Sequence, residues 1–367
     1  MTTKILCVVG TRPEAIKMAP VIIALKQQNW VSLRILATAQ HRNLLDQVLS
    51  FFGIVPDIDL DVMYHNQTLA SLTSRLLSDI DQVLDTEKPH IVLTQGDTTT
   101  AMTVALACFY HQIPLGHIEA GLRTWDKHNP FPEEINRVIT GRLANWHFAP
   151  TERARQNLLR EGTTDSHIIV TGNTVIDALL IAAKKKPQLS ITLNTTKRMI
   201  LVTSHRRENF GDPFKNICRA INALANANQD IEILFPVHPN PNIKDIAHEL
   251  LANCSNIILC EPLDYGDFIA AMQQAYFIIS DSGGIQEEAP ALGKPVLVLR
   301  DETERPEAVE QGVVKLVGSD YSTIIENAQR LLDDTSAYYS MVNGLSPYGN
   351  GKSAEKIVAV LKDHIVS

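Results

Sequence analysis

Short runs of β-branched and other apolar residues alternate with longer amphipathic stretches along the whole of this 367-residue chain. Continuous apolar runs of this kind are typical of strands buried in parallel sheets, and the amphipathic stretches between them predict helices that cover those sheets. The pattern therefore predicts an α/β fold built from doubly wound parallel sheets.

In the first half of the chain, strands are expected at Lys4–Gly10, Leu33–Ala39, His90–Gly96, Ile113–Glu119, His147–Ala149 and His167–Gly172. Helices are expected near Glu14–Gln28, Arg42–Phe52, Leu69–Glu87, Thr99–His111, Pro132–Leu143, Glu152–Arg160 and Val175–Lys185. A polar, aperiodic stretch then follows around Pro187, and it is predicted to be a linker.

In the second half, strands are expected at Met199–Ser204, Ile231–Val237, Ile257–Glu261, Tyr276–Ser280, Pro295–Leu299 and Val313–Val317. Helices are expected at Pro213–Asn226, Ile243–Leu251, Phe268–Gln274, Ile285–Leu292, Glu307–Gln311 and Tyr321–Leu332. A break at Pro347–Gly351 precedes a terminal helix at Ser353–His364, for which Ser353 is a candidate N-cap. We expect two Rossmann-like domains, residues 1–183 and 184–352, with a ligand cleft between them at the carboxyl ends of the strands.

Composition narrows the class of protein further. Lys and Arg total 33 and Asp and Glu total 41, which gives a net charge of −8 without a long block of one sign. Nucleic acid and anionic membranes attract basic faces, so neither is an expected partner. No apolar run approaches the roughly 18 residues of a membrane span, and the N-terminus leads into an apolar run of only five residues, shorter than the ~7–15 residues of a signal-peptide core. We therefore expect a soluble, cytoplasmic protein.

The cysteines and histidines do not indicate a metal site. The five cysteines contain no Cys-x-x-Cys pair, which favours free thiols over a disulfide framework or a zinc site. The twelve histidines show no paired ligand spacing. Neither a metal nor another cofactor is therefore expected.

The first candidate site follows the first predicted strand, at Gly10–Lys17. A glycine turn, Arg12 and a helix opened by Pro13 would gather backbone N–H groups and positive charge around one point, which suits a phosphate. Lys17 would either add charge or pair with Glu14, one helical turn away. The alternative is a plain strand-to-helix turn with an exposed arginine. The glycine fingerprints of nicotinamide-binding proteins and of nucleoside triphosphatases are absent.

Two carboxylates, Asp97 and Glu119, end two predicted strands of the same half. An acid in the place of Asp97 is commonly a helix N-cap. If the two strands adjoin, however, the carboxylates crowd each other, and repulsion together with desolvation raises at least one pKa toward the range useful for proton transfer. Glu133 is a third candidate, although an ordinary i, i+4 pair with Arg137 would also explain it.

The second half contains two further candidate segments. His205, Arg206 and Arg207 form a cationic cluster in an acidic protein, which favours an anionic ligand; the alternative is a surface salt-bridge cluster with Glu208. The Ser282–Gly284 turn opens a helix, where small residues allow close approach of a diphosphate, and Glu288 is placed to accept hydrogen bonds from two ribose hydroxyls. Together the segments predict a protein that holds a nucleotide diphosphate conjugate and performs acid–base chemistry on its other part.

The chain resembles the bacterial non-hydrolysing UDP-N-acetylglucosamine 2-epimerases nearly from end to end. The segments that carry the resemblance are Gly10–Pro20, Gly96–Thr100, Glu119–Thr124, Pro132–Glu134, Thr171–Thr174, His205–Glu208 and Ser280–Glu288. The resemblance implies a GT-B fold, in which the C-terminal helix, residues 353–367, rejoins the first domain, and it implies a homodimer. It also implies reversible inversion at C2 of the sugar, by elimination of UDP to 2-acetamidoglucal and re-addition, to give UDP-N-acetylmannosamine for surface polysaccharides.

Site residues are implied by the same resemblance. The family's catalytic groups match Asp97, Glu119, Glu133 and His205, and its substrate-binding groups match Arg12, Lys17, Arg137, Phe268, Ser282, Gly283, Gly284 and Glu288. A second UDP-N-acetylglucosamine activates bacterial members, and the residues implicated there are similar to Gln40, His41, Gln67, Arg75 and Arg206. Which carboxylate acts on which face of the sugar stays open.

Two positions depart from the family pattern, and three other functions compete with the epimerase. Gln95 and Ser204 stand where close relatives usually have His and Gly, so rate or activator dependence can differ. A hydrolysing epimerase would release UDP and free N-acetylmannosamine. A GT-B glycosyltransferase would not need three carboxylates in the first domain, and a sugar-nucleotide sensor would not need the catalytic set at all. Fold alone does not separate these functions.

Overall fold

The computed structural model describes residues 2–38, 42–64, 67–344 and 346–365. The chain divides into two compact units, each with its own parallel sheet. The N-terminal unit comprises Met1–Ile181 and Tyr348–Ser367, and the C-terminal unit comprises Ala182–Pro347. The predicted α/β class with two doubly wound sheets is confirmed.

The N-terminal unit contains a seven-stranded sheet in the order β3-β2-β1-β4-β5-β6-β7. Its strands are β1 (Thr3–Val9), β2 (Val31–Ala37), β3 (Ile58–Asp59), β4 (Ile91–Gln95), β5 (Leu115–Ile118), β6 (Trp146–Ala149) and β7 (Ile168–Val170). Its helices are α1 (Arg12–Lys26), α2 (Arg42–Phe52), α3 (Leu69–Glu87), α4 (Thr99–Tyr110), α5 (Glu133–Leu143), α6 (Glu152–Arg160), α7 (Thr174–Lys184), which reaches into the C-terminal unit's range, and α15 (Ser353–Ile365), with a short 3-10 turn η1 (Asp165–His167).

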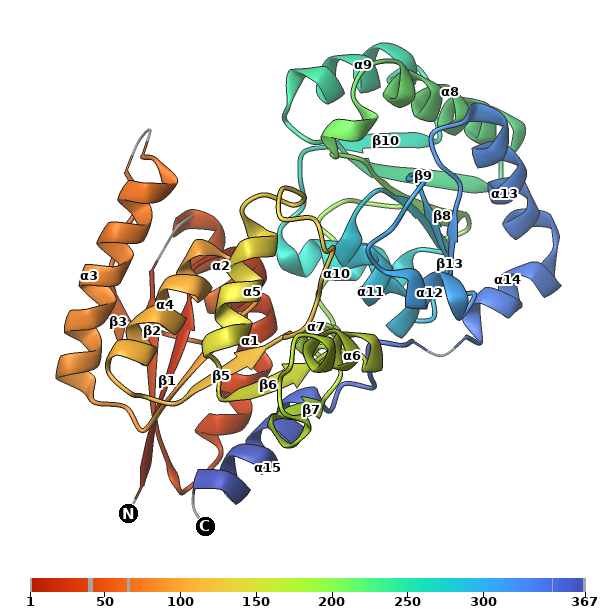
Figure 1. Ribbon diagram of the computed structural model, residues 1–367. Helices are drawn as coiled ribbons and strands as arrows, with labels where there is room; N and C mark the ends of the chain where they lie inside the picture. Colours follow the sequence, from red (N-terminus) through yellow and green to blue (C-terminus); the bar gives the residue numbers. More distant parts are fainter. Residues whose placement is uncertain (1, 39–41, 65–66, 345, 366–367) are drawn as a thin grey trace. The chain divides into compact units, whose positions relative to one another are not determined.

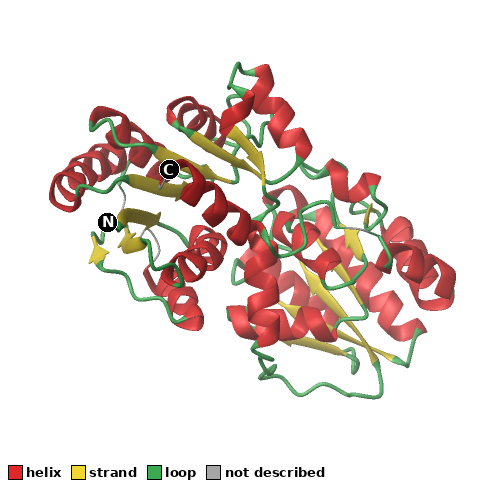
Figure 2. Ribbon diagram, turned by 90° about the horizontal axis from the view of Figure 1, so that it is seen from below, coloured by secondary structure: helices red, strands yellow, loops and turns green. Residues whose placement is uncertain are grey.

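Helices cover both faces of this sheet, as Figure 2 shows. Contacts join α3, α4 and α5 into one layer and α1, α2 and α15 into another. Between the sheet and the first layer lies an apolar core in which Leu76 and Ile80 of α3 pack with Leu6 and Val92 of the strands. All five residues of β4 are buried, which is why the central strands appear in the sequence as continuous apolar runs.

The C-terminal unit contains a six-stranded sheet in the order β10-β9-β8-β11-β12-β13. Its strands are β8 (Arg198–Thr203), β9 (Ile231–Pro236), β10 (Ile257–Cys260), β11 (Phe277–Ser280), β12 (Val296–Val298) and β13 (Val314–Leu316). Its helices are α8 (Asp212–Ala227), α9 (Pro241–Leu251), α10 (Tyr265–Gln274), α11 (Gly283–Ala291), α12 (Pro306–Glu310), α13 (Tyr321–Asp333) and α14 (Thr335–Val342), with a 3-10 turn η2 (Arg207–Asn209). Its core packs α8 and α13 against the sheet through residues such as Phe214, Ile221 and Leu331.

None of the helices within the described ranges is long and apolar enough to cross a lipid bilayer. One strand and one α-helix of the described residues were not predicted from the sequence. The strand β3 has only two residues, and α14 is short, with eight residues of which none is buried.

The C-terminal helix α15 belongs to the N-terminal unit and packs against α1, beside which Figure 1 shows it. The prediction that Ser353 caps this helix is wrong, because Ser353 is its first helical residue. A side chain from another helix accepts the hydrogen bond of a backbone N–H group at the start of α15. Oδ1 of the buried Asp177, in α7, accepts a hydrogen bond of 2.8 Å from the backbone N–H of Ala354. Asp177 thus ties the two helices together.

The substitution Asp177→Ala is expected to lower the free energy of unfolding by about 1–2 kcal/mol, because the buried start of α15 loses its acceptor. Denaturant unfolding gives the free energy, and amide hydrogen exchange of residues 354–365 is expected to accelerate. Asp320→Ala, which removes the exposed cap of α13, is the matched control and leaves exchange in α15 unchanged. Unaltered exchange of α15 in Asp177→Ala would contradict this role.

Candidate active site

In each unit the candidate residues cluster where the strand order reverses. β1 and β4 are neighbours in the N-terminal sheet, as β8 and β11 are in the C-terminal sheet, and each pair marks such a switch point. Ligands of doubly wound sheets bind outside the carboxyl ends of the strands at this point. The segments that begin at Gly10, Gly96, Ser204 and Asp281 all lie there, directly after β1, β4, β8 and β11.

The turn between β1 and α1 is built around Glu14. Thr11 caps the helix, and the buried carboxylate of Glu14 accepts hydrogen bonds from the backbone N–H groups of Gly10 (2.9 Å) and Thr11 (2.6 Å), which completes a capping box. The Thr98 hydroxyl donates a third, at 2.6 Å, to Glu14. Gly10 has no room for a side chain, since a Cβ would lie 2.7 Å from the hydroxyls of Thr38 and Thr100. Half-buried Arg12 is therefore held at the first position of α1.

Asp97 stands between β4 and α4, and Thr98, not Asp97, caps the helix. One carboxylate oxygen of Asp97 accepts a hydrogen bond of 2.6 Å from the guanidinium of Arg137, and its backbone carbonyl accepts one of 2.9 Å from Asn136. Burial raises the pKa of Asp97, Arg137 opposes this shift, and Glu119 adds to it. The expected crowding of two acids at adjacent strand ends is confirmed, since β4 pairs with β5.

Glu119 follows β5 in a left-handed backbone conformation with φ of +65°, which is costly for a residue with a side chain. Its buried carboxylate accepts hydrogen bonds from Lys17 (2.5 Å), Gln95 (2.5 Å) and Asn173 (2.8 Å). These donors come from α1, β4 and the start of α7. An acid held by a cation and two amides is fixed in position.

Two pairings suggested by spacing in the sequence are wrong. Lys17 pairs with Glu119 and not with Glu14, whose carboxylate already serves the capping box. Arg137 bonds Asp97 and lies 3.6 Å from Glu134, so it does not form the expected i, i+4 pair with Glu133. In both cases a tertiary partner just beyond the end of a strand replaces the local one.

Glu133 begins α5 and lines a hollow of about 380 Å³ in the N-terminal unit. Thr11, Thr98 and Asn136 line the same hollow, and so does Gln67. The neighbouring Glu134 is buried and accepts hydrogen bonds from the backbone N–H groups of Thr124 and Trp125. Glu133 therefore faces open space at the site while Glu134 shapes the preceding loop.

Sequence reasoning gave no role to Asn136 and Asn173, and it noted Gln95 only as a departure from the family. All three side-chain amides contact Asp97 or Glu119 directly. Their positions in the sequence could have identified them as site residues. Gln95 ends a strand, Asn136 lies in the first turn of α5, and Asn173 directly precedes α7.

In the C-terminal unit, Asp281 organises the segment that contains His205. This carboxylate is fully buried, and Oδ2 accepts hydrogen bonds from the Ser204 hydroxyl (2.9 Å) and from the backbone N–H groups of His205 (2.9 Å) and Arg206 (3.0 Å). Glu208 pairs with Arg300, with Nε and Oε1 2.7 Å apart. The alternative interpretation was a surface salt-bridge cluster between Glu208 and the neighbouring cations. Glu208 instead pairs with Arg300, which lies just after β12.

Ser282 directly precedes α11, which begins with Gly283 and Gly284, and the N–H groups at the start of a helix suit an anion. The adjacent acids differ in their surroundings: Glu287 pairs with Arg305 at 2.5 Å, and Glu288, also buried, lies one residue further along the helix. Phe268 is half-buried in α10 of the same unit.

Of the residues expected to bind an activator, Gln40 and His41 lie outside the described residues. The structure brings Gln67 and Arg75 together, with a hydrogen bond of 3.0 Å from the guanidinium to the amide oxygen. Arg75 also stacks over the ring of Tyr64 at 4.0 Å. Arg206 belongs to the other unit and is half-buried.

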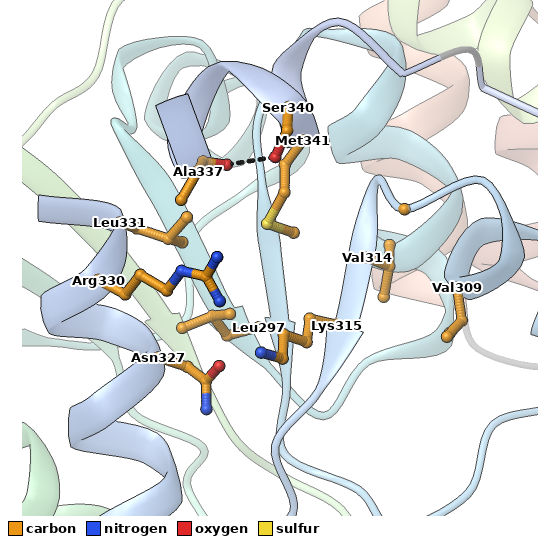
Figure 3. A pocket seen from close by; sticks show the side chains of 11 residues that line it. Leu297, Val309, Val314, Lys315, Asn327, Arg330, Leu331, Ala337, Ser340 and Met341 are labelled. Carbon is orange, nitrogen blue, oxygen red and sulfur yellow. Dashed lines mark hydrogen bonds between the residues drawn. The ribbon is translucent and has the colours of Figure 1, made fainter. Parts of the chain in front are cut away.

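A further hollow of about 270 Å³ in the C-terminal unit, shown in Figure 3, contains none of these residues. Its walls come from β12, β13, α12, α13 and α14 and include Leu297, Lys315, Arg330 and Met341. Both cations on its wall are exposed, so the hollow does not present a buried charge to a ligand.

Two Rossmann-like units, with carboxylates at one switch point and a glycine turn beside a histidine at the other, define a protein of the GT-B class. A 15% identical cyanobacterial structure, Anabaena HepE, supports this assignment at the level of the fold, with a TM-score of 0.64. The family model for UDP-N-acetylglucosamine 2-epimerase matches residues 23–362. The chain therefore belongs to the UDP-N-acetylglucosamine 2-epimerase family.

Similar proteins cover the chain almost completely. The UDP-N-acetylglucosamine 2-epimerases of Yersinia pestis and Escherichia coli K12 are each 50% identical to it, over 99% of this chain and the whole of theirs. The crystal structure of the Neisseria meningitidis enzyme bound to UDP-GlcNAc is 48% identical, with a TM-score of 0.90, and covers 99% of this chain and 100% of that one. A 2.2 Å structure of the Listeria monocytogenes protein is 45% identical, with a TM-score of 0.93, over 100% of this chain and 97% of that one.

Proposed function

We propose that this protein interconverts UDP-N-acetylglucosamine and UDP-N-acetylmannosamine by inverting C2 of the sugar, without net hydrolysis. The observation that carries this function is the pair of carboxylates on adjacent strand ends, Asp97 bonded to Arg137 and Glu119 bonded to Lys17. Family membership supplies the substrate. The product would serve as a sugar donor for surface polysaccharides.

The chemistry requires acids and bases close to C2. A base removes the C2 proton, the C1–O bond breaks, and UDP leaves with the electron pair, which gives 2-acetamidoglucal. UDP then adds back to C1 as a proton reaches the other face of C2. Because no carbonyl acidifies C2, the base must be well placed and the leaving diphosphate strongly stabilised.

We assign the proton transfers to Asp97, Glu119 and Glu133. Asp97 and Glu119 lie in different settings, since burial raises the pKa of Asp97 whereas Glu119 accepts hydrogen bonds from one cation and two amides. Unequal carboxylates in one site are typical of paired acid and base catalysts. Arg12, Lys17 and Arg137 supply the positive charge on this unit that the substrate requires.

We assign the nucleotide to the C-terminal unit. The start of α11 at Ser282, Gly283 and Gly284 would receive the diphosphate, and Glu288 would accept hydrogen bonds from the ribose hydroxyls. Phe268 would lie against the uracil. His205 would face the diphosphate and stabilise it as it leaves C1.

His205→Ala is expected to slow turnover by about 100-fold, because the departing diphosphate loses a stabilising partner at the moment of C1–O cleavage. Steady-state assay of UDP-N-acetylmannosamine formation measures the loss. The exposed His248 of α9 offers a matched control, and His248→Ala retains full turnover. Unchanged turnover in His205→Ala would remove His205 from the mechanism.

We further propose regulation and assembly on the family pattern. A second UDP-N-acetylglucosamine would act as activator through Gln67, Arg75 and Arg206, together with Gln40 and His41, and the protein would be a homodimer. The contact between Arg75 and Gln67 supports a shared role for these two residues.

Product analysis tests the reaction. Purified protein is incubated with UDP-N-acetylglucosamine alone, and the nucleotides are separated by anion-exchange chromatography. An equilibrium mixture of two UDP-sugars with little free UDP is expected. Stoichiometric free UDP and N-acetylmannosamine would instead establish a hydrolysing epimerase, and no conversion would favour a transferase or a sensor.

A further inference from the structure

Asp281 and His205 form a carboxylate–imidazole pair at the switch point of the C-terminal sheet. Nδ1 of His205 lies 3.3 Å from Oδ1 of Asp281, whose side chain has no exposed surface, whereas the His205 side chain is 43% exposed. One edge of the imidazole thus faces a buried negative charge, and the ring remains accessible to a ligand.

The two oxygens of Asp281 have different tasks. Oδ2 accepts hydrogen bonds from the Ser204 hydroxyl, the backbone N–H groups of His205 and Arg206, and the side-chain amide of Asn209 at 3.0 Å. Oδ1 faces the ring, and it also accepts a longer hydrogen bond of 3.2 Å from the backbone N–H of His205. Oδ2 therefore fixes the backbone, and Oδ1 is the atom that acts on the imidazole.

We propose that Asp281 is a positioning residue for His205: its carboxylate holds the Nδ1–H and stabilises the protonated ring, whose second proton, on Nε2, is presented to an anionic ligand. In catalytic and metal-binding histidines, a carboxylate beside one ring nitrogen keeps the proton on that nitrogen and so fixes the role of the other nitrogen. This role rests on the proposed function, in which His205 stabilises the departing diphosphate. The proton stays shared between Nε2 and a diphosphate oxygen during departure, and returns fully to Nε2 when UDP adds back.

Several charged groups around the ring set its protonation. Burial lowers the pKa of His205 and Asp281 raises it, while Arg206 and His238 lower it further. His238, which follows β9, stacks on the ring with centroids 6.2 Å apart. Asp281 is thus the group that opposes the loss of the proton, and its removal must lower the pKa of His205.

Asp281→Asn separates the two tasks of the carboxylate. Its amide oxygen can take the place of Oδ2 and keep those hydrogen bonds, which leaves the NH2 group toward Nδ1. An NH2 group there favours an unprotonated Nδ1 and moves the proton of the neutral ring to Nε2. We therefore expect retained folding and a reversed tautomer.

The kinetic test uses the pH profile. Turnover of Asp281→Asn is expected to fall by about 100-fold. Because protonated His205 is the active form in this proposal, the wild-type rate falls as pH rises through its pKa, and this limb moves to lower pH in Asp281→Asn. In the His205→Ala background, adding Asp281→Asn is expected to cost less than threefold, because both changes remove one function. Full, additive losses would show that Asp281 acts structurally and would overturn the inference.

Ser204→Ala is the matched control, because it removes one hydrogen bond to Oδ2 and leaves the carboxylate in place. Its pH limb is expected to coincide with that of the wild type, whatever its rate. An equal shift of the limb in Ser204→Ala and Asp281→Asn would contradict a special role for the charge.

A direct measurement on the wild-type protein does not depend on the folding of any variant. Histidine ¹⁵N chemical shifts, with His205 assigned by its absence in His205→Ala, report the neutral tautomer at high pH. The Nδ1–H tautomer is expected, and the Nε2–H tautomer would overturn the inference. A wild-type protein that shows the Nδ1–H tautomer but does not epimerise would instead contradict the proposed function alone.

Discussion

Asp97→Asn is expected to reduce epimerisation by about 10³–10⁴-fold while the affinity for UDP, measured by calorimetry, changes less than about threefold. Asparagine keeps the shape of the side chain and can still accept the 2.6 Å hydrogen bond from Arg137. It cannot accept or return a proton, so the loss falls on the chemical step, in which general acid–base catalysis contributes up to about 10⁴-fold.

Asp57 provides the matched control for this substitution. The side chains of Asp57 and Asp97 are each 32% exposed. Asp57 also pairs with an arginine, since its Oδ1 lies 2.8 Å from Nη1 of Arg34. Asp57→Asn is expected to retain full turnover. A large loss of UDP affinity in Asp97→Asn would mean that Asp97 has a structural role.

Glu119→Gln is expected to reduce turnover by about 10³-fold and to leave the protein folded. The glutamine oxygen can accept the hydrogen bonds from Lys17 and Asn173, while its NH2 group meets Gln95, whose amide can turn to present its oxygen. The packing is therefore preserved, but Lys17 loses its negative partner and the site loses a group that exchanges protons.

Glu87 supplies the control for this second substitution. It pairs with Lys4 (3.3 Å) and with Arg34 (3.0 Å), so Glu87→Gln also removes a carboxylate from a lysine and an arginine of the same unit. Thermal unfolding of both variants separates stability from catalysis. If Glu119→Gln retained turnover comparable to that of Glu87→Gln, Glu119 would be a structural anchor of Lys17 and not a catalyst.

The sequence predicts the sheets and the positions of the site residues because both depend on local patterns. Buried parallel strands such as β4 are continuous apolar runs, and the ends of those strands meet at one edge of a sheet. Asp97 and Glu119 could therefore be expected side by side before any partner of either was known.

The partners of those residues could not be predicted, because they are set by tertiary contacts. Lys17 and Glu119 are 102 positions apart, and Asp97 and Arg137 are 40 apart. Rules for neighbouring residues on a helix offered Glu14 as one possible partner of Lys17, but Glu14 is already occupied by its capping box. The left-handed backbone conformation of Glu119 could not be predicted either, since glutamate does not favour it.

The most direct test of the proposed mechanism follows the C2 proton. An NMR time course of the purified protein with UDP-N-acetylglucosamine in D2O, with no metal or nicotinamide added, is expected to show UDP-N-acetylmannosamine accumulating to equilibrium. Both sugars would carry deuterium at C2, because the proton is removed by one carboxylate and replaced from solvent. Epimerisation with full retention of the C2 proton, or no epimerisation, would contradict the assignment of Asp97, Glu119 and Glu133 as proton-transfer groups.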